Sequence, residues 1–232
     1  MLYFEGQICK RCRMGMSFGK TLLDFFFPPK CAFCGALLKS DGDGICETCR
    51  RELPVTGDKK LKFDFISFAA APFYYEGVVR QALLRYKFQG VPARGRVYGR
   101  LIAEELIRRG ETDYDLLTWV PLSRKRERRR GYDQARILAE SAGERLGLPV
   151  ARTLLKVRHT PPQSRIRTKE ARRANVSGCF QTTDANIAAG KRVLLIDDIL
   201  TTGATVSECA RVLMLSGAES VSAAAVACHR DD

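Results

Sequence analysis

The sequence predicts an α/β protein in which a parallel sheet follows a small metal-binding module. Two observations carry this prediction. Six of the nine cysteines in the 232-residue chain lie before residue 50, in three C-x2-C pairs. From residue 63 onward, short apolar runs alternate with amphipathic stretches, as strands and helices do around a parallel sheet. At about 100–200 residues per domain, the length allows one ordinary domain plus such a module.

Two of the cysteine pairs predict a zinc site. They are separated by eleven residues, and Asp-Gly-Asp-Gly at 41–44 supplies a turn between them. A C-x2-C turn aims two sulfurs at one point, and two such turns complete the tetrahedral thiolate set that suits zinc. Because so short a ribbon buries little apolar surface, the metal would supply most of its folding energy. The predicted ligands are Cys31, Cys34, Cys46 and Cys49.

The third pair, Cys9 and Cys12, lies in a basic extension before the ribbon. Since four cysteines already saturate one zinc ion, this pair is either a set of spare thiols or half of a second metal site. The polar stretch 56–62 marks the end of the ribbon. We therefore expect an N-terminal extension over 1–20, a zinc ribbon over 21–57 and an α/β domain over 58–232.

Four strands and four helices are expected in the α/β domain. The strands are apolar runs at 65–75, 115–120, 193–196 and 221–226. The helices show helical spacing and ordinary boundary residues, with Asp133 as an N-cap and Gly110, Gly147 and Gly217 at carboxyl ends. They are expected over 77–88, 94–109, 133–146 and 203–215. Parallel strands joined by right-handed crossovers place ligands beyond the carboxyl ends of the strands.

The most informative segment is VLLIDDILTTGAT at 193–205. Four apolar residues form a buried strand, Asp197 and Asp198 stand at its carboxyl end, and small residues then open a helix. Gly203 and its small neighbours let backbone N–H groups approach an anion, and the helix N-terminus adds positive potential. Two carboxylates repel a phosphate, so they must face hydroxyls or a cation carried by the ligand. A sugar phosphate meets both needs.

This segment resembles the phosphoribosyl-pyrophosphate (PRPP) loop of type I phosphoribosyltransferases. The resemblance implies that Asp197 and Asp198 hold the ribose 2′- and 3′-hydroxyls. It also implies that Mg²⁺ is bound chiefly by PRPP itself. The residues implied to cradle the 5′-phosphate are Thr201, Thr202, Gly203, Ala204 and Thr205.

Motifs across the rest of the chain, from about Thr21 to the C-terminus, are similar to those of ComF-type late-competence proteins. They are LLDFFFPPKC at 22–31, YEGVVR at 75–80, YKF at 86–88, RRRGYDQA at 128–135, TPPQS at 160–164 and RRANV at 172–176. The family implies a type I phosphoribosyltransferase fold behind a zinc ribbon. In bacteria it is linked to natural transformation, which implies single-stranded DNA and a helicase-type competence protein as partners; an oligomer is compatible with it.

The formal net charge of +13 is concentrated in two segments expected as loops. Residues 124–130 carry a net +5 and residues 156–173 a net +6. Three readings stay open: a solvated face, binding of the diphosphate leaving group, or contact with a nucleic-acid backbone. The first segment follows a strand where the phosphoribosyltransferase family places its pyrophosphate loop. The candidate cations are Arg124, Lys125, Arg128, Arg129, Arg130, Arg165, Arg172 and Arg173.

Several other residues allow two readings. His159 is either a proton shuttle or an exposed loop residue, and Tyr132 and Phe180 either stack on a base or pack in the core. Trp119 is expected in the core, and no residue has the features of a committed general base. The single cysteines expected as buried thiols are Cys179, Cys209 and Cys228.

Two functional classes are compatible with these features. The first is an enzyme that transfers the phosphoribosyl group of PRPP to a nucleobase, ammonia or another nucleophile. The second, which we favour as the biological role, is a PRPP-binding module that supports uptake of single-stranded DNA. Because no stretch reaches about 18 consecutive apolar residues and no secretory signal is evident, we expect a cytoplasmic protein without a membrane span.

Overall fold

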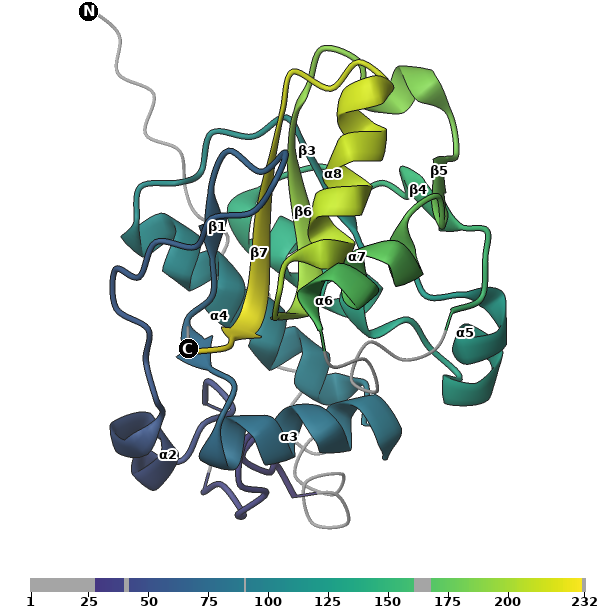
Figure 1. Ribbon diagram of the computed structural model, residues 1–232. Coiled ribbons are helices and arrows are strands. Elements are labelled where there is room, and N and C mark those ends of the chain that lie inside the picture. Colours follow the sequence, from purple (N-terminus) through teal and green to yellow (C-terminus); the bar gives the residue numbers. More distant parts are fainter. Residues whose placement is uncertain (1–27, 40–41, 90, 161–167, 231–232) are drawn as a thin grey trace, which may run out of the picture.

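The computed structural model describes residues 28–39, 42–89, 91–160 and 168–230 (Figure 1). The predicted extension with Cys9 and Cys12, and the candidate cation Arg165, lie outside the described residues.

The core is a parallel sheet with the strand order β1-β7-β6-β3, in which β2 also pairs with β7. Its strands are β1 (Ala69–Ala70), β2 (Phe73–Tyr74), β3 (Leu116–Trp119), β6 (Arg192–Leu200) and β7 (Ser220–Cys228). β6 and β7 form the centre, paired from Arg192↔Ser220 to Leu200↔Cys228. The predicted parallel sheet is confirmed, and all described pairings between its strands are parallel.

Helices cover both faces of this sheet (Figure 1). Leu194 and Ile196 of β6 pack in one cluster, while Val193 and Leu195 pack in another. The first cluster includes residues of three helices: α3 (Gly77–Phe88), α4 (Ala93–Arg108) and α6 (Gln134–Leu146). The second includes α7 (Lys169–Val176) and α8 (Ala204–Leu215). Side chains of a strand alternate between faces, so β6 is buried on both sides, as its unbroken apolar run predicts.

The strand expected over 65–75 is two very short strands. Between them, the Ala71 carbonyl accepts from the Thr56 hydroxyl at 2.6 Å, and the Pro72 carbonyl accepts from the Thr56 N–H at 3.0 Å. Backbone groups that would continue the ladder are thus bonded to another segment, and Pro72 has no N–H to donate. A separate antiparallel pair, β4 (Leu154–Lys156) and β5 (Phe180–Thr182), lies outside the main sheet.

The first basic segment was expected as a loop, and this expectation is wrong: it forms the helix α5 (Arg124–Arg130). Arginine, lysine and glutamate are good helix formers, and Gly131 ends the helix in the left-handed conformation with φ +81°. Part of the second segment likewise belongs to α7. The boundaries predicted for α6 are confirmed, because Asp133 accepts from the Arg136 N–H and Gly147 has φ +69°.

The cysteine-rich module packs into the same core as α3 and α4. It contains the short helix α2 (Glu47–Glu52). The Phe33 ring lies 5.4 Å from the rings of both Phe73 and Tyr98, and the Tyr98 hydroxyl donates to the Ala32 carbonyl at 2.7 Å. The module therefore shares its hydrophobic contacts with the α/β domain. Among the described residues, no helix is long and apolar enough to cross a bilayer.

Candidate functional site

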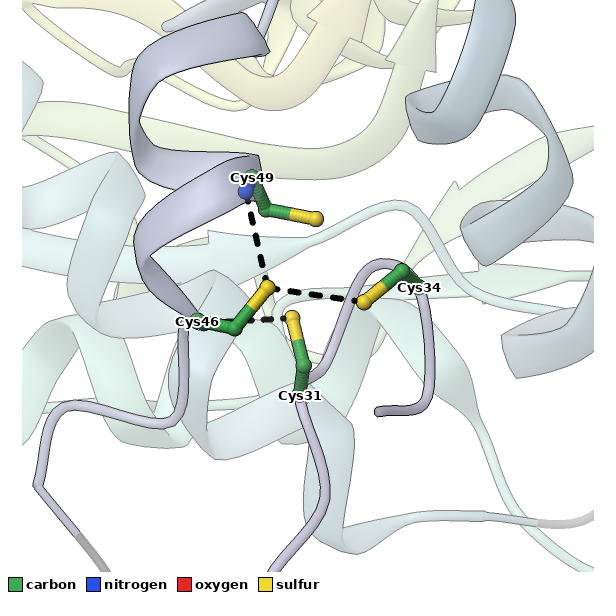
Figure 2. Close-up of side chains that lie close together, drawn as sticks. All are labelled: Cys31, Cys34, Cys46 and Cys49. Atoms are coloured by element: carbon green, nitrogen blue, oxygen red, sulfur yellow. Dashed lines mark hydrogen bonds between the residues drawn. The ribbon is translucent and has the colours of Figure 1, made fainter. Parts of the chain in front are cut away.

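The four predicted zinc ligands converge on one point (Figure 2). Cys31 and Cys34 lie on one turn, while Cys46 is the N-cap of α2 and Cys49 lies in its first turn. Their sulfur atoms all lie within 4.8 Å of one another. Thiolates on a tetrahedron with Zn–S bonds of about 2.3 Å are about 3.8 Å apart, so the cluster fits a zinc ion.

Backbone N–H groups point at these sulfurs. The Cys34 sulfur accepts from Ala36 at 3.4 Å, the Cys31 sulfur from Cys46 at 3.4 Å, and the Cys46 sulfur from Cys49 at 3.5 Å. Burial raises the pKa of Cys31, but hydrogen bonds from the backbone outweigh burial and lower this pKa to about 6. Burial raises the pKa values of Cys34 and Cys49, so it is the all-sulfur ligand set and its convergence that match a structural zinc site.

The second cluster of functional groups lies at the carboxyl end of β6. Asp197 and Asp198 are neighbours on this strand, so their side chains leave it on opposite faces. The Asp198 N–H donates to Asp197 Oδ1 at 2.8 Å. Burial, and then the charge of Asp198, raises the pKa of Asp197 to about 8. Burial and the neighbouring Asp198 charge thus disfavour ionisation of Asp197.

Lys87 of α3 completes this acid pair, because its Nζ lies 2.9 Å from Asp198 Oδ2. The two side chains are only 19% and 15% exposed. A sequence signal for Lys87 exists: it continues the apolar stripe of Val79 and Leu83 at i+4 spacing, where a buried residue is expected. A lysine at such a position indicates a partner carboxylate, which residue types alone do not identify.

The loop after β6 is shaped by Gly203. This residue is the N-cap of α8 with φ +75°, and it has no side chain to accept from the first-turn N–H groups of the helix. A Cβ at Gly203 would lie 2.0 Å from Phe63 Cδ1, so the packing of the Phe63 side chain also requires glycine here. Thr201 is exposed, and Thr202 and Thr205 are half-buried. The loop therefore presents an amide-rich helix N-terminus beside the acid pair.

The cations of α5 divide into exposed and held residues. Arg130 is held, because its Nη1 donates to Gln134 Oε1 at 2.6 Å and its Cζ lies 5.1 Å from the centre of the Phe88 ring. Arg126 is also held, donating to the Thr160 carbonyl at 2.6 Å. The exposed cations are Arg124, Lys125, Arg128 and Arg129.

Several cations of the second basic segment, 156–173, are engaged within the protein and are therefore less available to bind an anion than the charge of the segment suggests. Arg173 forms an ion pair with Asp64 at 2.6 Å, and Arg158 donates to the Ser177 carbonyl at 2.7 Å. Arg172 is half-buried on α7. Two of these arginines therefore hold neighbouring segments of the chain, whereas the exposed cations of α5 face solvent.

Three buried donors near α5 lack a partner in the part of the chain that the structure describes. They are Arg130 Nε, Gln134 Nε2 and the hydroxyl of Thr160, a residue that is 4% exposed. Buried polar groups are normally hydrogen-bonded, so these unpaired donors are candidates to bind an oxygen-rich ligand. Thr160 begins the TPPQS motif at 160–164, but nothing in this motif indicates that its hydroxyl is unpaired.

His159, Phe180 and Tyr132 each had two possible roles from the sequence, and the structure shows their surroundings. Ser123 Oγ lies 3.0 Å from His159 Nδ1, and desolvation together with the charges of Arg126 and Lys125 lowers the pKa of His159. Phe180 is buried at 3% exposure, and the hydroxyl of half-buried Tyr132 bonds to the Tyr86 carbonyl, so both are packing residues. The residues confirmed as buried are Trp119, Cys179, Cys209 and Cys228.

Two family models match this chain, one on each part of the fold. The double zinc ribbon domain matches residues 22–59, and the phosphoribosyl transferase domain matches residues 129–232. The first covers the four clustered cysteines, and the second begins at the last two residues of α5 and covers the acid pair and the loop before α8.

Several known proteins are similar to half or more of this chain. Competence protein ComFC of Bacillus subtilis is 30% identical over 196 residues, which cover 81% of this chain and 78% of that protein. Competence protein F of Haemophilus influenzae is 26% identical over 220 residues, covering 84% and 95%. DNA utilization protein YhgH of Salmonella typhi is 31% identical over 125 residues, covering 52% and 54%. The chain therefore belongs to the ComF family of competence proteins, with a zinc ribbon ahead of its phosphoribosyltransferase domain.

Proposed function

We propose that this protein binds PRPP together with Mg²⁺ at the carboxyl end of β6, and that it supports the handling of single-stranded DNA in the cytoplasm during natural transformation. One observation carries the first half of this proposal. An acid pair neutralised by Lys87 is followed directly by the uncapped N-terminus of α8. Carboxylates suit ribose hydroxyls, and helix-terminal amides suit a phosphate.

In this proposal the ligand spans the end of the sheet. Asp197 and Asp198 accept from the ribose hydroxyls, and Mg²⁺ is carried chiefly by the diphosphate. The 5′-phosphate lies on the loop formed by Thr201, Thr202, Gly203, Ala204 and Thr205. The unpaired donors Arg130 Nε and Thr160 Oγ1 support a diphosphate position beside α5.

Titration calorimetry with Mg-PRPP tests this site. The double variant Asp197→Ala, Asp198→Ala should lose measurable binding. The matched control is Asp113→Ala, Asp115→Ala, which removes two exposed carboxylates that pair with Arg192 at the opposite end of β6. Binding that survives in the first variant, or is lost equally in both, would contradict the assignment.

The second half of the proposal is supported by the exposed cations of α5, with relatives named for competence and for DNA utilization. Phosphate contacts make affinity fall with salt, by a log–log slope of about 0.7 per contact for single strands. The double variant Arg128→Ala, Arg129→Ala should therefore bind an oligonucleotide more weakly and with a shallower slope. An unchanged slope would remove α5 from the DNA contact.

An active phosphoribosyltransferase is the second candidate, and the unpaired donors beside α5 favour it, because a leaving diphosphate needs such groups. A screen for diphosphate release from PRPP with nucleobases, ammonia and other acceptors decides between them. Release with any acceptor supports the enzyme, whereas PRPP binding without turnover supports the binding module.

The proposed boundaries are an extension over 1–20, a ribbon over 21–57 and a phosphoribosyltransferase-like domain over 58–232. The packing of Phe33 against Tyr98 supports a ribbon that stays attached to the domain by more than the chain. Cleavage near residue 57 should leave the two fragments associated. A helicase-type protein is the partner we propose for the DNA-handling role, testable by co-purification with the full chain.

A further inference from the structure

Phe88 is an exposed aromatic residue beside the acid pair. It is the last residue of α3 and 63% of it is exposed. It follows Lys87, whose Nζ contacts Asp198 at 2.9 Å, so its backbone is fixed next to the proposed ribose site. The guanidinium carbon of Arg130 lies 5.1 Å from its ring centre. The ring therefore lies against an arginine of α5 and next in the chain to the lysine that contacts the acid pair.

Its aromatic neighbours behave differently. Tyr86 is fully buried and donates to the Gln134 carbonyl at 3.0 Å, and Tyr132 is half-buried against Tyr86. Phe88 belongs to neither of the two described hydrophobic clusters. A single exposed apolar residue is ordinary on a protein surface. Here a second observation accompanies it, because Arg130 is fixed over the ring by its bond to Gln134.

The surroundings of Phe88 match one class of ligand. Arg130 lies over the ring. The other turns of the same helix, α5, carry the exposed cations Arg124, Lys125, Arg128 and Arg129. Sites for single-stranded nucleic acid combine a positive track for the backbone with aromatic rings on which bases stack. A free nucleobase would use the ring but has no charge for these cations. A duplex would use the cations, but its bases are already stacked.

We infer that Phe88 is a stacking platform for a base of single-stranded nucleic acid whose backbone runs along α5. This rests on the proposed DNA contact of α5 and extends it, because it assigns a base contact to Phe88 beside the phosphate contacts of α5. Phe88 would contact bases and the α5 cations would contact phosphates, so the two contributions to DNA affinity can be measured separately.

Fluorescence anisotropy with the full chain tests this separation. The probes are a fluorescein-labelled thymidine oligonucleotide and an abasic oligomer with the same number of phosphates. Phe88→Ala should weaken binding of the thymidine oligonucleotide by about 5- to 100-fold and leave the abasic oligomer unaffected. Phe88→Trp should restore binding. The matched control is Phe65→Ala, which removes another exposed phenylalanine, 55% exposed, and should change neither affinity.

The outcomes are distinguishable. Equal losses on both oligomers, or an unchanged affinity for the thymidine oligonucleotide, would overturn the platform while leaving the DNA contact in place. A wild-type chain that binds neither oligomer would overturn the DNA contact and the platform together. PRPP calorimetry on the wild-type chain is independent of both results. A steep salt dependence retained in Phe88→Ala would support base stacking as the lost contribution.

Discussion

Replacing Lys87 with methionine removes the cation that neutralises the acid pair of β6. The Nζ–Oδ2 distance is 2.9 Å and both side chains are mostly buried. Two unit charges at that separation attract by about 6 kcal/mol at an effective dielectric constant of about 20. Desolvation and the ordering of the lysine, the latter about 1.5–2 kcal/mol, oppose this attraction. We therefore expect a net loss of about 2 kcal/mol.

Thermal unfolding measures this loss directly. For a chain of this size, about 2 kcal/mol corresponds to a fall in Tm of about 4–8 °C. Arg80→Met is the control, because Arg80 is exposed on the same helix. In a double-mutant cycle, Lys87→Met and Asp198→Asn should couple by about 2 kcal/mol, since either change removes the same ion pair. Additive effects, to within about 0.5 kcal/mol, would refute the reasoning.

Three further predictions concern pH, backbone and metal. The raised pKa of Asp197, about 8, means that its stabilising protonated form is fully present below the unfolded pKa near 3.8 and is lost as pH rises through 8. Asp197→Asn should therefore flatten the decline of stability between pH 5 and 8 in urea unfolding. Gly203→Ala should destabilise the fold more than Gly131→Ala, because both have positive φ but only Gly203 lies against Phe63; equal Tm values would contradict this. Elemental analysis should give one zinc per chain, and a chelator should lower Tm, since the ribbon shares the core; an unchanged Tm would show that the metal is not structural.

The central strands were predictable because burial on both faces requires a continuous apolar run, which the local sequence contains. Val193, Leu194, Leu195 and Ile196 are all apolar, as a strand covered on both faces requires. The helix boundaries at Asp133 and Gly147 follow from local capping chemistry. Four clustered cysteines were equally predictable, because two C-x2-C turns constrain the geometry of their sulfurs.

The rest depends on contacts between distant segments. Lys87 and Asp198 are 111 residues apart, and only the fold brings α3 to the end of β6. β4 and β5 are three residues each and are joined through α7, so neither has a turn signal. α5 was mistaken for a loop because its seven residues have no apolar stripe, although their helix propensity is high.

A crystal structure of the protein with Mg-PRPP tests the central proposal most directly. We predict the 5′-phosphate on the amides at the N-terminus of α8 and the ribose hydroxyls on Asp197 and Asp198. The diphosphate should extend toward Arg130 and Thr160, giving their unpaired donors an acceptor. PRPP bound elsewhere, with the loop at Gly203 empty, would contradict the proposed site.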